Sequence, residues 1–185
     1  MSYVFWISLL FVSFYANANN INVGRGKTFT TITAAVAAAK PGDSIQVYPG
    51  TYLEKNLIID KKLILIGINL PVLDGENKYE IITIKASGTS VIGFKLINSG
   101  ISSLEEISGI KVIDCKNVSI KNNIFDNVFF GIYFQASSHC FVENNKLSAH
   151  KTNEQQSGNG IHCWKSDSLY ILRNEISGHR DGIYF

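Results

Sequence analysis

Three histidines are the residues whose types and spacing could bind a metal. His150 and His179 each lie five residues after an asparagine that recurs along the chain, Asn145 and Asn174. If the two recurrences lie on neighbouring parallel strands, the two imidazoles come within about 5 Å of each other. His162 would project outward from the next strand, so the three side chains could hold copper or zinc. The alternative is a pair of solvated turn histidines, with His150 carried away by a local insertion.

Carboxylates could act as an acid–base pair, or hold calcium, only if they align between recurrences. Asp126 aligns with Ser148 and Ser177, and Asp181 aligns with Asn159, so neither aspartate has a carboxylate partner in its column. The simpler interpretation of both is a solvated turn residue. We therefore expect no catalytic residues among them.

Three cysteines, Cys115, Cys140 and Cys163, offer the softest ligands after residue 1. Cys140 and Cys163 fall on apolar columns, which predicts buried thiols that behave as small hydrophobic residues. Cys115 shares a turn column with Ser137 and Ser166 and is expected to be simply a small residue. The three cysteines do not align with one another, so no cysteine metal site is predicted.

Aromatic and charged side chains are expected on the outer surface. Tyr133 and Tyr184 alternate with apolar residues, and Phe141 and Tyr170 do so on another segment. Exposed aromatic columns of this kind are typical of interaction surfaces. We expect this surface to include Tyr133, Tyr170 and Tyr184, together with Arg180 and Asp181 in a tight turn.

A repeat of about 22 residues positions all of these side chains. Gly-Ile pairs begin at Gly109, Gly131, Gly160 and Gly182, with spacings of 22, 29 and 22 residues. An asparagine recurs in step at positions 123, 145 and 174. Two insertions of seven residues interrupt the repeat: the first lies at residues 100–108, and the second, around residues 150–158, explains the 29-residue spacing. Such a unit, with two short strands, is typical of one coil of a solenoid.

Alternation within the repeat assigns an inner and an outer face. The inner columns are apolar and include Ile110, Ile132, Ile161 and Ile183. Stacking them predicts an all-β protein, a right-handed parallel β-helix, with a possible asparagine ladder in one turn. The Ala-rich segment from Thr31 to Lys40 is the one good helix, and it should cap the open end of the core.

The first residues are expected to be an export signal. An apolar run over 4–15 precedes Ala16-Asn17-Ala18, which fits a signal-peptidase site. We therefore expect a signal peptide over 1–18 and a β-helix domain over 19–185, with no membrane-spanning segment once the signal is removed. The apolar columns continue to Phe185, so we expect the domain to be truncated at its C-terminal end.

Charge and composition exclude some classes of function. The chain has 185 residues, 17 Lys and Arg against 15 Asp and Glu, and a net charge of +2. That balance excludes a protein that binds nucleic acid through bulk positive charge. No nucleic-acid partner is therefore expected.

Two segments near the end resemble the NosD family. They are residues 158–164 (GNGIHCW) and 174–185 (NEISGHRDGIYF). The earlier segments 38–52 (AAKPGDSIQVYPGTY), 73–75 (LDG) and 92–100 (IGFKLINSG) occur more widely among exported β-helix proteins, including those that act on sugars. The resemblance runs from about Val23 to the end of the chain.

This resemblance implies a role outside the cytoplasmic membrane, in the periplasm. Such a protein works with an ABC-type ATPase and permease to assemble the copper–sulfide centre of nitrous oxide reductase, without being a catalyst. No firmly bound cofactor is expected, and the histidines could hold copper transiently. The alternative function is a carbohydrate-binding or polysaccharide-degrading β-helix protein.

Overall fold

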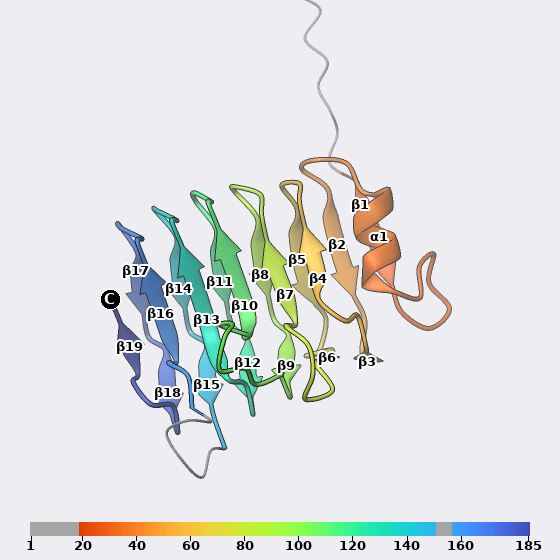
Figure 1. The fold of residues 1–185 in the computed structure, drawn as a ribbon. Coiled ribbons are helices and arrows are strands. Elements are labelled where there is room, and N and C mark those ends of the chain that lie inside the picture. Colours follow the sequence, from red (N-terminus) through yellow and green to blue (C-terminus); the bar gives the residue numbers. More distant parts are fainter. Residues whose placement is uncertain (1–18, 151–156) are drawn as a thin grey trace, which may run out of the picture.

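The computed structural model describes residues 19–150 and 157–185. These residues form a parallel β-helix with a short helix at one end (Figure 1). The predicted fold class is confirmed. The segments 1–18 and 151–156 lie outside the described residues, so the predicted signal peptide stays a prediction.

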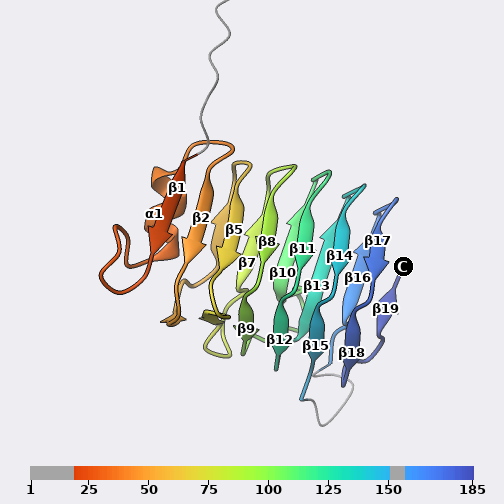
Figure 2. The ribbon, with the colours of Figure 1, turned by 180° about the vertical axis from the view of Figure 1, so that it is seen from behind.

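Three parallel sheets run along the solenoid, and each coil contributes one strand to each of them (Figures 1 and 2). Sheet 1 consists of β1 (Asn20–Val23), β2 (Ser44–Val47), β5 (Ile64–Gly67), β8 (Ser90–Ile92), β11 (Ser119–Lys121), β14 (Phe141–Glu143) and β17 (Tyr170–Leu172). Sheet 2 consists of β3 (Thr51–Tyr52), β6 (Val72–Asp74), β9 (Lys95–Ile97), β12 (Ile124–Asp126), β15 (Lys146–Ser148) and β18 (Glu175–Ser177). Sheet 3 consists of β4 (Leu57–Ile59), β7 (Ile82–Ile84), β10 (Ser108–Ile113), β13 (Phe130–Gln135), β16 (Ile161–Trp164) and β19 (Ile183–Tyr184).

The observed register matches the predicted columns. In sheet 3, Ile132 pairs with Ile110 on one side and with Ile161 on the other, and Ile161 pairs with Ile183. Because parallel strands stack in register, each inward side chain lies against a similar one in the next coil. The repeat spacing therefore determined the register correctly on both sides of the second insertion.

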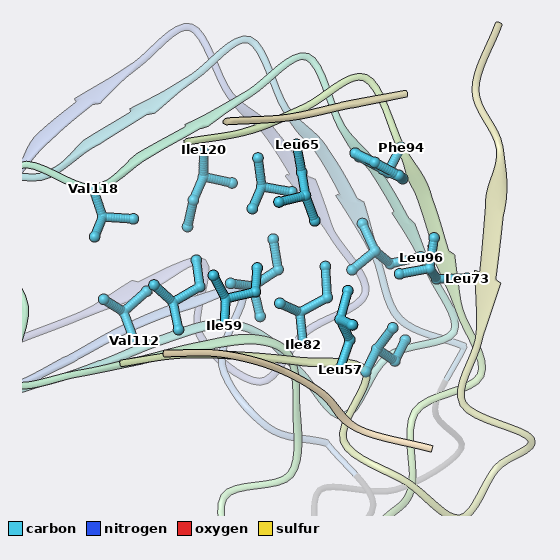
Figure 3. Packing of buried hydrophobic residues seen from close by; sticks show 14 of the residues in the cluster. Leu57, Ile59, Leu65, Leu73, Ile82, Phe94, Leu96, Val112, Val118 and Ile120 are labelled. Carbon is cyan, nitrogen blue, oxygen red and sulfur yellow. The ribbon is translucent and has the colours of Figure 1, made fainter. Parts of the chain in front are cut away.

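Inward side chains from all three sheets fill one continuous core (Figure 3). Leu57 and Ile82 of sheet 3 and Leu65 of sheet 1 lie in the same interior as Leu73 and Leu96 of sheet 2, and all five are at most 1% exposed. Burial of each such side chain stabilises the fold by about 2 kcal/mol. The stacked columns are thus the main source of stability.

The helix closes the end of this core, as predicted, although it is shorter than the Ala-rich segment. Helix α1 spans Ile32–Ala38 and buries Ile32, Ala35 and Val36. Thr31 caps its N-terminus, and the Glu54 carboxylate accepts hydrogen bonds from the backbone N–H groups of Ile32 and Thr33. No helix among the described residues is long and apolar enough to cross a membrane.

Each coil contains three short strands, where the repeat had indicated two. The recurring asparagine lies at a corner between β11 and β12, and between β14 and β15. The residue before it adopts a left-handed conformation, with φ of 56° at Asn122 and 55° at Asn144. Asparagine accepts this conformation at low cost, so the chain bends sharply inside what the sequence shows as one strand-like segment.

Candidate functional site

A column of rings stands on the outer face of sheet 3. Tyr133, His162 and Tyr184 are paired in register on β13, β16 and β19. The His162 ring stacks on Tyr133 with centroids 4.9 Å apart and on Tyr184 with centroids 5.0 Å apart. These rings point away from the core because they alternate with Ile132, Ile161 and Ile183.

A second hydrophobic cluster, separate from the core, covers one end of this column. It consists of Phe129, Phe130 and Tyr133. Phe130 meets Phe129 and Tyr133 edge to face, with centroid distances of 5.0 and 5.6 Å. Tyr133 is only 5% exposed, so its expected place on an exposed surface is wrong: it points outward, but the phenylalanines cover it.

A loop borders the face of sheet 3. Residues 98–107, which join β9 to β10, lie beside β10 and β13 (Figure 1), where Ile107 accepts a hydrogen bond from the backbone of Phe130. Most of the first predicted insertion lies in this loop. The second insertion precedes β16, and its residues 151–156 lie outside the described residues.

A groove of two adjoining cavities lies between these features. One cavity, of about 340 Å³, is lined by loop residues 102–106 together with Phe129, Phe130, Ser157 and Arg180. The other, of about 370 Å³, is lined by Glu106, Tyr133, Gln135, His162 and Trp164. Glu106 lines both cavities and therefore lies where they adjoin.

Hydrogen bonds hold His162 in one tautomer. The Asn159 side chain contacts Arg180 through Oδ1, at 3.3 Å, and His162 Nδ1 through Nδ2, at 2.9 Å. Because Arg180 can only donate, Asn159 Oδ1 is the acceptor and its amide nitrogen donates to His162. Nδ1 is therefore an acceptor, and the proton of the neutral ring lies on Nε2.

Burial lowers the pKa of His162, and this effect exceeds the influence of the nearby charges of Glu106, Arg180 and Asp181. Burial also raises the pKa of the Tyr133 hydroxyl, and the charge of Glu106 adds to that shift. Both groups are therefore uncharged near neutral pH. Next to them, Lys111 Nζ lies 2.6 Å from Glu80 Oε2, which neutralises that part of the face.

The three predicted histidines lie in different surroundings. His150 is exposed, and its Nε2 lies 2.7 Å from Asp126 Oδ1, an interaction that helps to lower the pKa of Asp126. His162 lies within the ring column, and His179 is half-buried beside Gly160. Residues 19–150 and 157–185 contain no group of three or more His, Cys, Asp or Glu side chains that could hold a metal ion. Metal binding by these histidines stays a prediction.

The other predicted surface residues lie at or near the groove. Tyr184 ends the ring column, Arg180 lines the first cavity, and Asp181 lies 3.4 Å from the Arg180 guanidinium. Tyr170 is on another face, where it stacks on Phe141 in sheet 1. Cys140 and Cys163 are buried, as expected; Cys115 is buried as well, and none of the three is in a disulfide.

Sequence reasoning missed Glu106, Gln135 and Trp164. Gln135 and Trp164 are paired in the outer column next to the rings, so alternation could have revealed both. Glu106 lies in the first insertion, and no repeat constrains where an insertion folds. Its part in the groove became visible only in the structure.

The comparisons with known proteins agree on the fold and the family. A family model described as "Periplasmic copper-binding protein (NosD)" matches residues 36–185. A curated relative from Pseudomonas aeruginosa, named "Probable ABC transporter binding protein NosD", is 28% identical over 129 residues, which are 69% of this chain and 30% of that relative.

Among solved structures, the fold is similar to that of a pectin methylesterase mutant crystallised in complex with a hexasaccharide. The TM-score is 0.55 at 16% identity, and the match covers 88% of this chain and 67% of that one. At this identity the likeness concerns the parallel β-helix alone.

Proposed function

This chain belongs to the NosD family, and on that premise we propose that it is an exported accessory protein for the assembly of a copper enzyme. It works in the periplasm with an ABC transporter and helps to build the copper–sulfide centre of nitrous oxide reductase. It has no catalytic activity of its own, and any copper that it binds is held transiently and passed on.

The family match over residues 36–185 is the observation that carries this proposal. The family description names copper and the periplasm, and the curated relative is named for binding to an ABC transporter. The chain spans 30% of the length of that relative, so partner contacts of the whole relative can also lie in regions that this chain does not match.

The groove on sheet 3 suits a binding role. It gathers aromatic rings, a neutral imidazole, an amide and a carboxylate on a rigid sheet. Such side chains recognise a partner by shape and hydrogen bonding and need no covalent chemistry. We assign partner contact to this groove.

Deletion of the gene in its own host tests the function. We expect nitrous oxide reductase to be made and exported, but to lack the copper and sulfide of its active centre and to be inactive. The full-length gene supplied in trans should restore both. Normal copper and sulfide content in the deletion strain would overturn the proposal.

One observation favours a second candidate function, carbohydrate binding. The Trp164 indole is 50% exposed and lines a cavity together with Gln135 and Glu106. A flat ring beside planar polar groups can bind a sugar ring by stacking and hydrogen bonding. Titration with neutral and acidic oligosaccharides, followed by the Trp164 indole resonance, separates this function from the first.

A further inference from the structure

We propose that the cavity lined by Glu106, Tyr133, Gln135, His162 and Trp164 binds an arginine side chain of a partner protein. The guanidinium stacks on the Trp164 indole and pairs with the Glu106 carboxylate. For the identity of the partner the inference rests on the proposed function, whereas arginine binding itself can be tested without any partner.

Charge at the groove favours a cation. Glu105 and Glu106 are adjacent and exposed, and neither makes an ion pair within residues 19–150 and 157–185. On the same face, Lys111 and Arg180 are already paired with Glu80 and Asp181, and Lys165 lies over the Trp164 ring. The two unpaired carboxylates outnumber this one remaining cation, so the groove is locally acidic.

Two walls of the cavity, His162 and Tyr133, carry no charge that would repel a cation. Asn159 donates to Nδ1 of His162, which keeps the imidazole in its neutral form. Burial lowers the pKa of the same ring, so it stays uncharged at neutral pH. The neighbouring Tyr133 hydroxyl is also uncharged.

Trp164 already attracts a cation within the molecule. Lys165 Nζ lies 5.6 Å from the centre of the indole ring, within the range of a cation–π contact. The ring is still half exposed, so a partner's cation can reach it. Arginine suits the cavity better than lysine because its planar guanidinium stacks on an aromatic ring and offers five N–H donors. Gln135 and Glu106 supply acceptors for them.

The adjoining cavity favours a protein as the source of this cation. It shares Glu106 and is walled by Phe129 and Phe130. Leu104, at its edge, is 91% exposed, which leaves a large apolar side chain for a partner to cover. A chain segment with an apolar residue next to an arginine would fill both cavities.

Titration of the isotope-labelled full chain with N-acetyl-arginine methylamide tests the inference. We expect a saturable shift of the Trp164 indole resonance, which is assigned through Trp164→Leu. The lysine derivative should bind more weakly, and the citrulline derivative, which has the same shape without the charge, should give no saturable shift.

Matched variants locate the counter-ion. Glu106→Gln should weaken binding by about fivefold, the upper range for a partly exposed ion pair. Glu105→Gln removes the same charge from the neighbouring residue, outside this cavity, and should leave binding nearly unchanged. Backbone resonances of both variants report whether the fold is intact.

Three results would overturn the inference: citrulline binding as tightly as arginine, equal effects of the two glutamate variants, or a Trp164 shift with oligosaccharides but none with arginine. The test is independent of the deletion experiment. Arginine binding with normal reductase maturation in the deletion strain would contradict only the proposed function.

Discussion

Tyr133 shows that the direction of a side chain and its exposure are separate properties. Alternation along β13 places it on the outer face, and the register with His162 confirms that direction. Phe129 and Phe130, four and three residues earlier in the chain, pack against its ring. A residue on the outer face of the solenoid is therefore buried almost as well as one in the core.

Replacement of Tyr133 should accordingly be costly. Tyr133→Ser removes a buried ring and its contacts with Phe130 and His162, and we expect it to lower the free energy of unfolding by about 3 kcal/mol. Tyr170→Ser is the matched control, because Tyr170 is also stacked in an outer column but is 49% exposed. It should cost less than about 1 kcal/mol. Urea unfolding measures both, and equal losses would show that the outer cluster does not contribute to stability.

A ladder of asparagines joins successive coils at the corner between sheets 1 and 2. Asn145 Oδ1 accepts hydrogen bonds from the backbone and side-chain N–H groups of Asn123, at 3.0 and 3.1 Å. Asn145 Nδ2 donates to the Ile120 carbonyl, and the Asn145 backbone donates to Asn174 Oδ1. The ladder thus satisfies buried backbone groups that the bend removes from the sheets. The predicted ladder is confirmed.

Removal of one rung should destabilise the element. Asn145→Ala leaves the Asn123 backbone N–H and the Ile120 carbonyl without these partners inside the protein, which should cost about 2–4 kcal/mol. Lys146→Ala, at the next residue, breaks only an exposed ion pair with Glu175 and should cost less than about 1 kcal/mol. Denaturant unfolding compares the two variants. Similar denaturant midpoints for the two variants would show that the asparagine ladder does not contribute to stability.

At the scale of the whole molecule, the three thiols report on the closure of the core. Cys115, Cys140 and Cys163 are all at most 4% exposed. Burial raises the pKa of Cys115 to about 11 and that of Cys163 to about 12. Thiolates react and thiols hardly do, so these groups should be inert in the folded protein.

We expect no fast reaction with a thiol reagent at pH about 8, and reaction of all three thiols in denaturant. The raised pKa values also predict the alkaline limit. As the pH rises, the thiols lose their protons in the unfolded state before they do so in the folded state. The free energy of unfolding should therefore be unaffected by the thiols below pH about 9 and should fall as the pH rises toward 11–12. Cys163→Ala should make that fall shallower. Rapid labelling of the folded chain would contradict a closed core.

The sequence by itself determined the repeat, and with it the register, the apolar inner columns, the asparagine ladder and the capping helix. These follow from local rules: alternation, turn residues and a fixed period act identically in every coil, so each coil confirms the next. The third strand of each coil was missed because the left-handed residue at the corner bends the chain without interrupting the apolar pattern.

The candidate site was decided by the tertiary structure. Phe129 and Phe130 cover Tyr133, and Glu106 lines two adjoining cavities. Arg180 orients the Asn159 amide, and that amide sets the tautomer of His162. Glu106 comes from an insertion and the other groups come from three coils, and an insertion has no period that relates it to its neighbours. Where such a loop folds depends on the surface that it can cover, and that surface exists only once the coils have stacked.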